Sequence, residues 1–377
     1  MIVSDSNLSR SLPIEGWDVA HLAAMRISTL IGWGLGAILV SCGDGSPAHE
    51  EAGGAGSVAA DGGGRRIAAS ASHGCALRGS GLYCWGDNFV GQLGTGDTTD
   101  APERPVKAQI AAGDVAEIAA DSGRTCARRK NGEVACWGDN AQGQIGDGTR
   151  DNASTPLNAG GVRDARQLAI DDVSSCVLHA DRTVSCWGAS PDDEPTSGSL
   201  IARPIAGAQD VIDLRGGVRG TYCARTQAGP VHCWRLQDGV WSAALEVPSL
   251  AGARSVAVTF QDEVCGIVPS DAIVCHNLDS GHDGTLGTSQ GALELVSGLL
   301  SVCARKTSGW SCWNVLPSML ELFGSAEIPL SLEMPLLEVA IGGLNACALR
   351  ADQSVVCADA SSISSAPNFA MHVELPP

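Results

Sequence analysis

Short apolar runs recur along most of the chain, and each is bounded by glycine or polar turn residues. An aliphatic residue stands eight positions before a cysteine in five of these runs, and two less regular runs keep one nearby. Runs of this length and composition predict β-strands. We therefore expect an all-β fold built from repeats. The aliphatic positions are Ile67, Ile118, Leu168, Leu295 and Val339, with Leu214 and Val258 in the less regular repeats.

Each repeat predicts the same succession of strands. An inner strand is followed by a strand with a first cysteine, a hairpin, a strand with a second cysteine, a glycine-rich loop and an edge strand. The edge assignment depends on a proline followed by an aliphatic residue, because proline cannot donate to a β-ladder and belongs at sheet edges. These pairs are Pro105-Val106, Pro156-Leu157 and Pro204-Ile205.

The cysteine spacing adds a constraint to the hairpins. The chain has 15 cysteines, of which 14 form seven pairs separated by 9 or 10 positions. Short loops such as Gly79-Ser80 and Lys130-Asn131-Gly132 then place the two cysteines of a pair opposite each other. That geometry suits a disulfide, whereas zinc sites use shorter gaps between paired cysteines. The predicted disulfides are Cys75–Cys84, Cys126–Cys136, Cys176–Cys186, Cys223–Cys233, Cys265–Cys275, Cys303–Cys312 and Cys347–Cys357.

The repeats have the length of propeller blades. The first cysteines of successive pairs are 51, 50, 47, 42, 38 and 44 positions apart. Periods of about 40–50 residues, made of short strands and glycine-rich turns, are typical of β-propellers. A tryptophan follows the second cysteine in five repeats, and its fixed place predicts packing between neighbouring blades rather than an aromatic binding surface. These are Trp85, Trp137, Trp187, Trp234 and Trp313.

The motif CALRGSGLYCWGDNFVGQLGTG, which begins at Cys75, resembles the repeat of the regulator of chromosome condensation family. It returns at Cys126 as CARRKNGEVACWGDNAQGQIG. The resemblance covers about residues 66–377. It is strong in repeats one and two, moderate in repeat three, and later carried mainly by the cysteine pair; repeat five keeps residues 284–288, GTLGT, where repeat one has 91–95, GQLGT. That family builds a seven-bladed β-propeller, so the resemblance implies this fold, in agreement with the seven cysteine pairs.

The N-terminal region has a different character. Residues 29–40 form an apolar run that is too short to span a bilayer and is typical of a signal-peptide core. Residues 39–42, LVSC, resemble the lipobox of bacterial lipoproteins, in which the cysteine is lipidated and becomes the mature N-terminus. The resemblance implies lipidation of Cys42; the alternative is a chance apolar run with a buried cysteine. The acidic start of the chain is unlike a signal peptide, so Met25 is an alternative initiation site.

We therefore divide the chain into three parts. Residues 1–41 are expected to be a signal peptide, and residues 66–377 the seven-bladed propeller. Residues 42–65 are rich in glycine, alanine and acidic residues without apolar periodicity, as flexible tethers are. The expected location is the bacterial cell envelope, with the lipid anchor at the outer membrane or cell surface.

Charge restricts the class of partner. The net charge is −18, which argues against nucleic acid or an acidic membrane surface. We expect contact with a membrane through the lipid anchor only, and a monomer. Eukaryotic members of the family that the repeats resemble bind chromatin and a small GTPase, but an acidic, exported, disulfide-rich chain is not expected to share those roles.

The sequence shows no convincing catalytic or cofactor-binding constellation. His73, His179 and His232 occupy unrelated positions of their repeats, which favours structural roles. Residues 277–283, NLDSGHD, alternate oxygen-bearing side chains like a calcium loop but lack the closing glutamate. We therefore expect no catalytic residue, no metal and no cofactor.

Loops on a rigid scaffold commonly carry binding residues. The longest predicted loops are 86–104, 138–155, 189–203 and 314–333. The last breaks the repeat and gathers apolar side chains, so we predict a candidate contact loop there; packing over blade six is the alternative. Its residues are Leu316, Met319, Leu320, Leu322 and Phe323.

These observations favour a non-catalytic, envelope-anchored lipoprotein whose propeller is a binding scaffold for a protein or glycan. One alternative is an inhibitor of a secreted enzyme, since a bacterial β-lactamase inhibitory protein is similar in fold. Another is an enzyme whose acids and histidines converge on the central channel.

Overall fold

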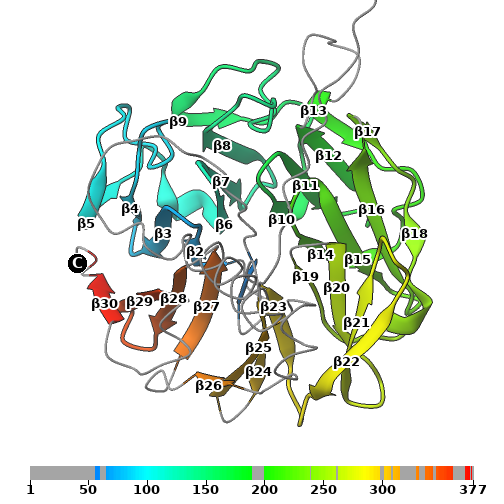
Figure 1. Cartoon of the computed structure of the whole chain (residues 1–377). Helices are drawn as coiled ribbons and strands as arrows, with labels where there is room; N and C mark the ends of the chain where they lie inside the picture. The colour runs from blue at the N-terminus through cyan, green and yellow to red at the C-terminus, as the bar shows by residue number, and fades with distance from the viewer. Residues whose placement is uncertain are drawn as a thin grey trace, which may run out of the picture. The chain divides into compact units, whose positions relative to one another are not determined.

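The computed structural model describes residues 56–59, 65–188, 199–237, 239–259, 262–297, 301–306, 309–314, 328–330, 336–342, 345–359, 370–373 and 375. All of them fall within one compact unit, Glu50–Pro377. They form seven antiparallel sheets of four or five strands, which follow one another around a common centre (Figure 1). Within this part of the chain, no helix has the length and apolar character that crossing a bilayer requires.

The first three sheets each use four consecutive strands. Blade one contains β2 (Ile67–Ala69), β3 (His73–Arg78), β4 (Gly81–Gly86) and β5 (Ala101–Lys107). Blade two contains β6 (Val115–Asp121), β7 (Arg124–Arg129), β8 (Val134–Gly138) and β9 (Ala153–Asn158), preceded by the 3-10 helix η1 (Ala112–Asp114). Blade three contains β10 (Ala165–Ile170), β11 (Ser174–His179), β12 (Val184–Gly188) and β13 (Ser199–Pro204).

The later sheets are less uniform. Blade four contains β14 (Val211–Gly216), β15 (Thr221–Thr226), β16 (Val231–Gln237), β17 (Val240–Trp241) and β18 (Leu245–Glu246). Blade five follows the 3-10 helix η2 (Pro248–Leu250) and contains β19 (Val256–Val258), β20 (Glu263–Ile267), β21 (Ala272–Asn277) and β22 (Asp283–Thr288). Blade six contains β23 (Glu294–Ser297), β24 (Ser301–Lys306), β25 (Gly309–Asn314) and β26 (Ile328–Leu330). Blade seven contains β1 (Gly56–Ala59), β27 (Leu336–Gly342), β28 (Asn345–Arg350), β29 (Val355–Asp359) and β30 (Ala370–Val373).

The inner strands form a closed ring. Each of β2, β6, β10, β14, β19, β23 and β27 contacts the next, and β27 contacts β2. The aliphatic residues that the sequence pattern singled out lie on these strands and are fully buried, as Ile118 and Leu168 illustrate. Burial of such a side chain contributes about 1.5–3 kcal/mol. The predicted seven-bladed, all-β propeller is therefore confirmed.

A repeated polar contact, which we call the inner clasp, joins neighbouring inner strands. The side chain just before the buried aliphatic residue of one blade accepts a hydrogen bond from the N–H of the aliphatic residue in the next blade. Because that N–H would otherwise be buried without a partner, the clasp satisfies it. The pairs are Glu117 with Leu168 at 3.1 Å, Gln167 with Leu214 at 2.9 Å, Ser255 with Leu295 at 2.9 Å, and Glu338 with Ile67 at 3.5 Å. In blade five the aliphatic residue at this position is Val256 and not Val258.

Blade seven closes the ring against blade one. Glu338 on β27 accepts the Arg66 N–H at 2.9 Å in addition to the Ile67 N–H. The outermost strand, β30, pairs with β29 of its own blade, and β1 adds to the inner edge of the same sheet by pairing with β27. The predicted tether of residues 42–65 therefore includes a strand of blade seven.

The cysteine pairs lie where the spacing predicts. In each hairpin the two cysteines are direct partners in the antiparallel register, as in Cys126 with Cys136. Six disulfides are described, with Cα atoms 3.9 to 4.1 Å apart. Cys303 is also disulfide-bonded and lies opposite Cys312 in the register. The hairpin disulfides are therefore confirmed.

Blade five departs from the sequence alignment. Residues 284–288, which match the loop segment 91–95 of blade one, lie in the edge strand β22 and pair with β21. The reason is length: Cys275 and Leu295 are 20 positions apart, whereas Cys84 and Ile118 are 34 apart. The shorter connection has no room for both a long loop and a separate edge strand, so the GTLGT segment supplies the strand itself.

Candidate functional site

The loop after the second cysteine strand has the same internal geometry in blades one and two. A fully buried asparagine, Asn88 or Asn140, organises each loop. The side-chain oxygen of Asn88 accepts the Leu93 N–H at 2.9 Å, and its amide group donates to the carbonyls of Asp97 and Thr99, both at 3.1 Å. Asn140 makes the equivalent bonds at 2.8, 3.1 and 3.1 Å. One satisfied amide therefore fixes the path of each loop.

The same loops hold the tryptophan of the next blade. The Trp137 indole N–H donates to the Gln92 carbonyl, and the Trp187 indole N–H donates to the Gln144 carbonyl, both at 2.9 Å. A Cβ atom added to Gly94 would lie 2.7 Å from Trp137 Nε1, so only glycine leaves room for the ring. We call this contact the tryptophan socket. It confirms, for Trp137 and Trp187, the predicted packing between neighbouring blades.

The two loops differ at their tips. Phe89 follows Asn88 in blade one and keeps 49% of its surface exposed. Its counterpart after Asn140 in blade two is Ala141. A shared and well-fixed loop scaffold therefore presents different side chains in successive blades.

Turns between the first and second strands lie beside these loops. The Asp139 N–H, at the start of the blade-two loop, donates to the carbonyl of Gly123 in the turn after β6 at 2.9 Å. The Asp87 N–H makes the same bond to the Ser72 carbonyl in blade one at 3.0 Å. We call the surface formed by these turns and by loops 86–100 and 138–152 the loop face.

The turns of blades two, three and four also hydrogen-bond to one another. Arg124 Nη2 donates to the carbonyls of Asp171 and Ser174 at 2.6 and 2.7 Å. The Asp171 carboxylate in turn accepts the Gly220 N–H at 2.7 Å. These bonds cross two blade boundaries, so the turns stabilise the relative positions of the loops beside them.

Burial changes the acid–base properties of this group of turns. It raises the pKa of Asp171 to about 7 and the pKa of Asp121 well above its ordinary value, while it lowers the pKa of Arg124. The Ser174 hydroxyl donates to Asp171 at 2.9 Å and lies 3.1 Å from the Tyr222 hydroxyl. Asp171 and Ser174 are fully buried, so these groups link blades and are not exposed to a substrate.

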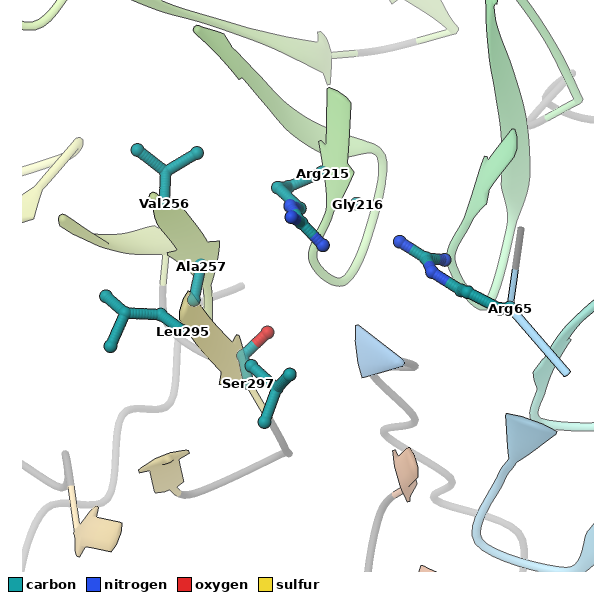
Figure 2. A pocket seen from close by; sticks show the side chains of 8 residues that line it. Arg65, Arg215, Gly216, Val256, Ala257, Leu295 and Ser297 are labelled. Carbon is teal, nitrogen blue, oxygen red and sulfur yellow. The ribbon is translucent and has the colours of Figure 1, made fainter. Parts of the chain in front are cut away.

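The centre of the ring contains a second polar region. A cavity of about 220 Å³, including its opening, is lined by Arg65, Arg215 and Ser297 and by residues of the inner strands β19 and β23, among them Val256 and Leu295. Figure 2 shows the guanidinium groups of Arg65 and Arg215 pointing toward each other across this space.

Acidic side chains lie beside both arginines. Arg65 Nε is 3.8 Å from Glu117, and Arg215 Nη2 is 3.2 Å from Asp213 and 3.7 Å from Glu294. Burial lowers the pKa of Arg65; the Glu117 charge opposes this effect and the Arg215 charge adds to it. For Asp213, burial acts to raise the pKa, but the charges of Arg215 and Arg225 outweigh it and the pKa is lowered.

Of the three histidines considered above, His73 and His179 have side-chain hydrogen-bond partners, whereas Nδ1 of His232 is buried without a described partner. His73 is buried, with Nδ1 2.8 Å from the Ser70 hydroxyl and Nε2 2.8 Å from the Thr125 hydroxyl, and burial lowers its pKa to about 4. His179 Nε2 lies 2.9 Å from the Ser185 hydroxyl.

The loop that resembles a calcium site is organised by Asn277. Its side-chain oxygen accepts the N–H groups of Asp279 and Ser280 at 3.1 and 2.8 Å. Among the described residues, no three His, Cys, Asp or Glu side chains are placed to hold a metal ion.

One catalytic sequence pattern was missed by the sequence analysis. Residues 287–291, GTSQG, match the Gly-x-Ser-x-Gly pattern of serine hydrolases. Ser289 is fully buried; its hydroxyl donates to Asp271 at 2.6 Å and accepts from Arg254 at 2.8 Å. The segment leaves an edge strand and enters a turn, whereas a nucleophile elbow joins a strand to a helix. Ser289 therefore has a structural role, and its match to the sequence pattern does not indicate a nucleophile.

Two groups of predicted site residues lie outside the described part of the chain. They are the predicted lipidation site, Cys42, and the candidate contact loop, Leu316, Met319, Leu320, Leu322 and Phe323.

Comparison with known proteins identifies the repeat. The family model described as the regulator of chromosome condensation (RCC1) repeat matches residues 65–92 and 115–144. The E3 ubiquitin-protein ligase HERC2 of Homo sapiens is 34% identical over 93 residues, which is 24% of this chain and 2% of that protein, and HERC2 of Mus musculus matches to the same extent. The chain thus spans a very small part of these relatives.

Two structures of yeast proteins resemble most of the fold. Prp20p from Saccharomyces cerevisiae has a TM-score of 0.52 at 17% identity, covering 71% of this chain and 82% of that one. Yeast RCC1 (Prp20) in its complex with Kap60 has a TM-score of 0.50 at 15% identity, covering 90% and 89%. With the repeat match and the closed ring of seven sheets, these likenesses establish that the chain is an RCC1-type repeat β-propeller.

Proposed function

We propose that this chain is a non-catalytic, envelope-anchored lipoprotein whose propeller binds a protein partner through the loop face. The observation that carries the proposal is the pair of loops with one scaffold and two different tips. Asn88 and Asn140 fix the loops by the same bonds, but Phe89 stands where blade two has Ala141. A half-exposed aromatic side chain on a rigid support is typical of residues that dominate binding energy at interfaces.

The comparisons support a protein as the class of partner. The structure of Prp20p is described together with its binding to Gsp1p and histones, so a propeller of this fold can serve as a protein-binding scaffold. The partners themselves do not transfer at 17% identity. A glycan is the alternative ligand, and the experiment below separates the two.

The loop face can be tested with matched surface variants. The immobilised full chain would be exposed to envelope extract and secreted protein, and the retained material measured for wild type, Phe89→Ser and Leu245→Ser. Leu245 is 67% exposed but lies on the outer edge strand β18, so it serves as the control. We expect Phe89→Ser to reduce retention at least tenfold, as loss of a hot-spot aromatic does at about 1.4 kcal/mol or more.

Retention that is unchanged in Phe89→Ser, or lost equally in both variants, would contradict binding through the loop face. If retention survives protease treatment of the extract but not glycosidase treatment, the bound partner is a glycan and not a protein.

The lipid anchor is a separate part of the proposal and depends on the resemblance of residues 39–42 to a lipobox. Cys42→Ser should move the chain from the membrane fraction to the soluble fraction, because a single cysteine carries the acyl chains that hold such proteins. Mass spectrometry of the N-terminal peptide is the direct measurement. An unmodified Cys42 in membrane-associated protein would contradict the anchor.

A further inference from the structure

The central cavity has an unusual composition for its position. Arg65 and Arg215 come from blades one and four, yet their guanidinium groups point into the same space (Figure 2). Ser297 lines it from blade six, and Val256 and Leu295 lie beside it with their side chains directed into the cores between blades. Its enclosed part has room for about one water-sized group. The Arg65 and Arg215 side chains are mostly buried, with 6% and 12% of their surface exposed, and the low local dielectric constant strengthens charge interactions there.

The two arginines have more hydrogen-bond donors than described acceptors. Together they carry about ten N–H donors. Among the described residues, Arg65 donates to the Leu168 carbonyl at 3.4 Å, and Arg215 Nη2 lies 3.2 and 3.4 Å from the two carboxylate oxygens of Asp213. Arg215 Nε is buried without any described partner. A buried charged donor without a partner costs free energy, so the cavity favours a group that can accept these bonds.

The charge around the cavity is positive although the whole chain is strongly acidic. The inner ion-pair network among the described residues has five guanidinium groups and four carboxylates: Arg65, Arg128, Arg215, Arg225 and Arg305, with Glu117, Asp213, Glu294 and Glu338. Burial raises the pKa of Glu338 to about 8, so this carboxyl is largely neutral at pH 7. The network therefore has at least one positive charge in excess, within a chain of net charge −18.

We propose that the central cavity binds a single carboxylate group, held between the guanidinium groups of Arg65 and Arg215. Guanidinium and carboxylate match in shape and form paired, charge-assisted hydrogen bonds. A carboxylate is larger than the water-sized enclosed part, so it would lie at the open side of the cavity, where both guanidinium groups can reach it. The carboxylate comes from a free small acid or from an acidic side chain of a peptide that enters the channel. This site is independent of the loop face.

The direct probe is formate, the smallest carboxylate. The full chain, labelled with ¹⁵N, would be titrated with sodium formate at constant ionic strength set with sodium chloride. We expect a saturable shift of the Arg215 Nε–H signal, because that donor gains an acceptor. Glutamate and an acetylated glutamate-containing tripeptide would be titrated in the same way, and tighter binding of the peptide than of glutamate would indicate a peptide side chain as the natural ligand.

Variants separate the cavity from general charge effects. Arg215→Lys keeps the charge but removes the paired donors, and it should weaken formate binding at least tenfold. Arg254→Lys is the matched control, because Arg254 pairs with Asp271 at the surface and does not line the cavity. It should bind formate as the wild type does. If Arg215→Lys unfolds the chain, Ser297→Leu tests the same site by filling the space, with the same loss expected.

Three results would overturn the proposal. They are a formate titration without saturation, equal weakening by Arg215→Lys and Arg254→Lys, and chloride competing as strongly as formate at equal concentration. The last result would show a halide-sized cavity with no preference for a carboxylate.

Discussion

Blades one to three and blades four to seven are all antiparallel sheets, but the contacts between blades differ. In blades one and two, a long loop forms a socket for the next tryptophan, Trp137 or Trp187. In blade four the chain turns back at once from β16 into β17, and in blade five only residues 278–282 separate β21 from β22. A Cβ added to Gly287 of blade five would meet Trp313 at 3.9 Å, compared with 2.7 Å for Gly94 and Trp137.

Every blade nevertheless keeps the cysteine hairpin, and inner clasps recur in both halves of the ring. Among the described residues, the loops of blades one and two form this socket, and the short connections of blades four and five do not. Blade four fills the equivalent space locally: Tyr222 stacks on Trp234 with ring centroids 6.3 Å apart and meets the edge of Trp241 at 5.8 Å. We infer that the disulfides matter most where the socket is absent.

The largest expected effect comes from emptying a socket. Trp137 is fully buried, so Trp137→Ala should destabilise the chain by about 3–5 kcal/mol through lost burial and a residual cavity. Trp241→Ala, which truncates a partly exposed tryptophan of blade four, is the matched control and should cost less. Chemical denaturation of both variants provides the measurement. Equal destabilisation by Trp137→Ala and Trp241→Ala would contradict the inferred difference between early and later blades.

The second prediction concerns pH at the seam between blades seven and one. Burial raises the pKa of Glu338 from its ordinary value of 4.5 to about 8. The folded state therefore binds this proton more tightly than the unfolded state, and stability should fall as pH rises from about 4.5 to about 8. Each pKa unit corresponds to about 1.4 kcal/mol, so the loss is on the order of a few kcal/mol.

Blade three provides the test of this prediction, because its clasp uses the neutral Gln167 in the same position. Glu338→Gln should flatten the dependence of Tm on pH across this range. Part of the slope should remain, because the pKa of Asp171 is raised to about 7 and acts in the same direction. A slope that is identical in wild type and Glu338→Gln would show that Glu338 is not the titrating group.

A third, smaller effect distinguishes the steric contact in the tryptophan socket from backbone strain at a glycine with positive φ. Gly94 and Gly79 both have positive φ, at 71° and 56°, but only Gly94 faces a tryptophan. Gly79→Ala should cost about 1 kcal/mol for the left-handed conformation alone. Gly94→Ala should cost at least about twice as much, because the new methyl group also displaces Trp137. Thermal unfolding of both variants measures the two costs. Equal costs would mean that the added methyl group does not strain the tryptophan socket.

The smallest effect tests the indole hydrogen bond. Trp137→Phe removes the bond to Gln92 and should cost about 1 kcal/mol more than Trp234→Phe, whose indole N–H has no described partner. Both rings are fully buried, so the loss of volume is matched. Denaturant titrations with errors of a few tenths of a kcal/mol are needed to resolve the difference, and the opposite order of stability would contradict the assigned bond.

The sequence predicted the blades because periodic features determine them. The buried aliphatic residue, the cysteine spacing and the edge proline each depend on local geometry that repeats. The match of residues 284–288 to residues 91–95 did not predict their place in an edge strand, since a sequence match does not show whether a short connection leaves room for a loop.

Contacts between distant blades were not predictable from pattern. Arg65 and Arg215 are 150 positions apart, and only the closed ring brings them to one cavity. The strand Gly56–Ala59 lacks apolar alternation and was assigned to the tether, yet the register pairs it with β27. The role of Asn88 likewise depends on carbonyl groups that converge only after the loop has closed.

The most direct test of the contrast between the two halves is hydrogen exchange of the full chain, followed by mass spectrometry, before and after reduction and alkylation of the disulfides. Removing a hairpin cross-link costs about 3 kcal/mol in the chain-entropy model, and the sockets of the early blades should offset part of this loss. We predict that β15 and β20 lose protection on reduction while β7 and β11 retain it. Simultaneous loss in all four strands, or earlier loss in β7 and β11, would contradict the account.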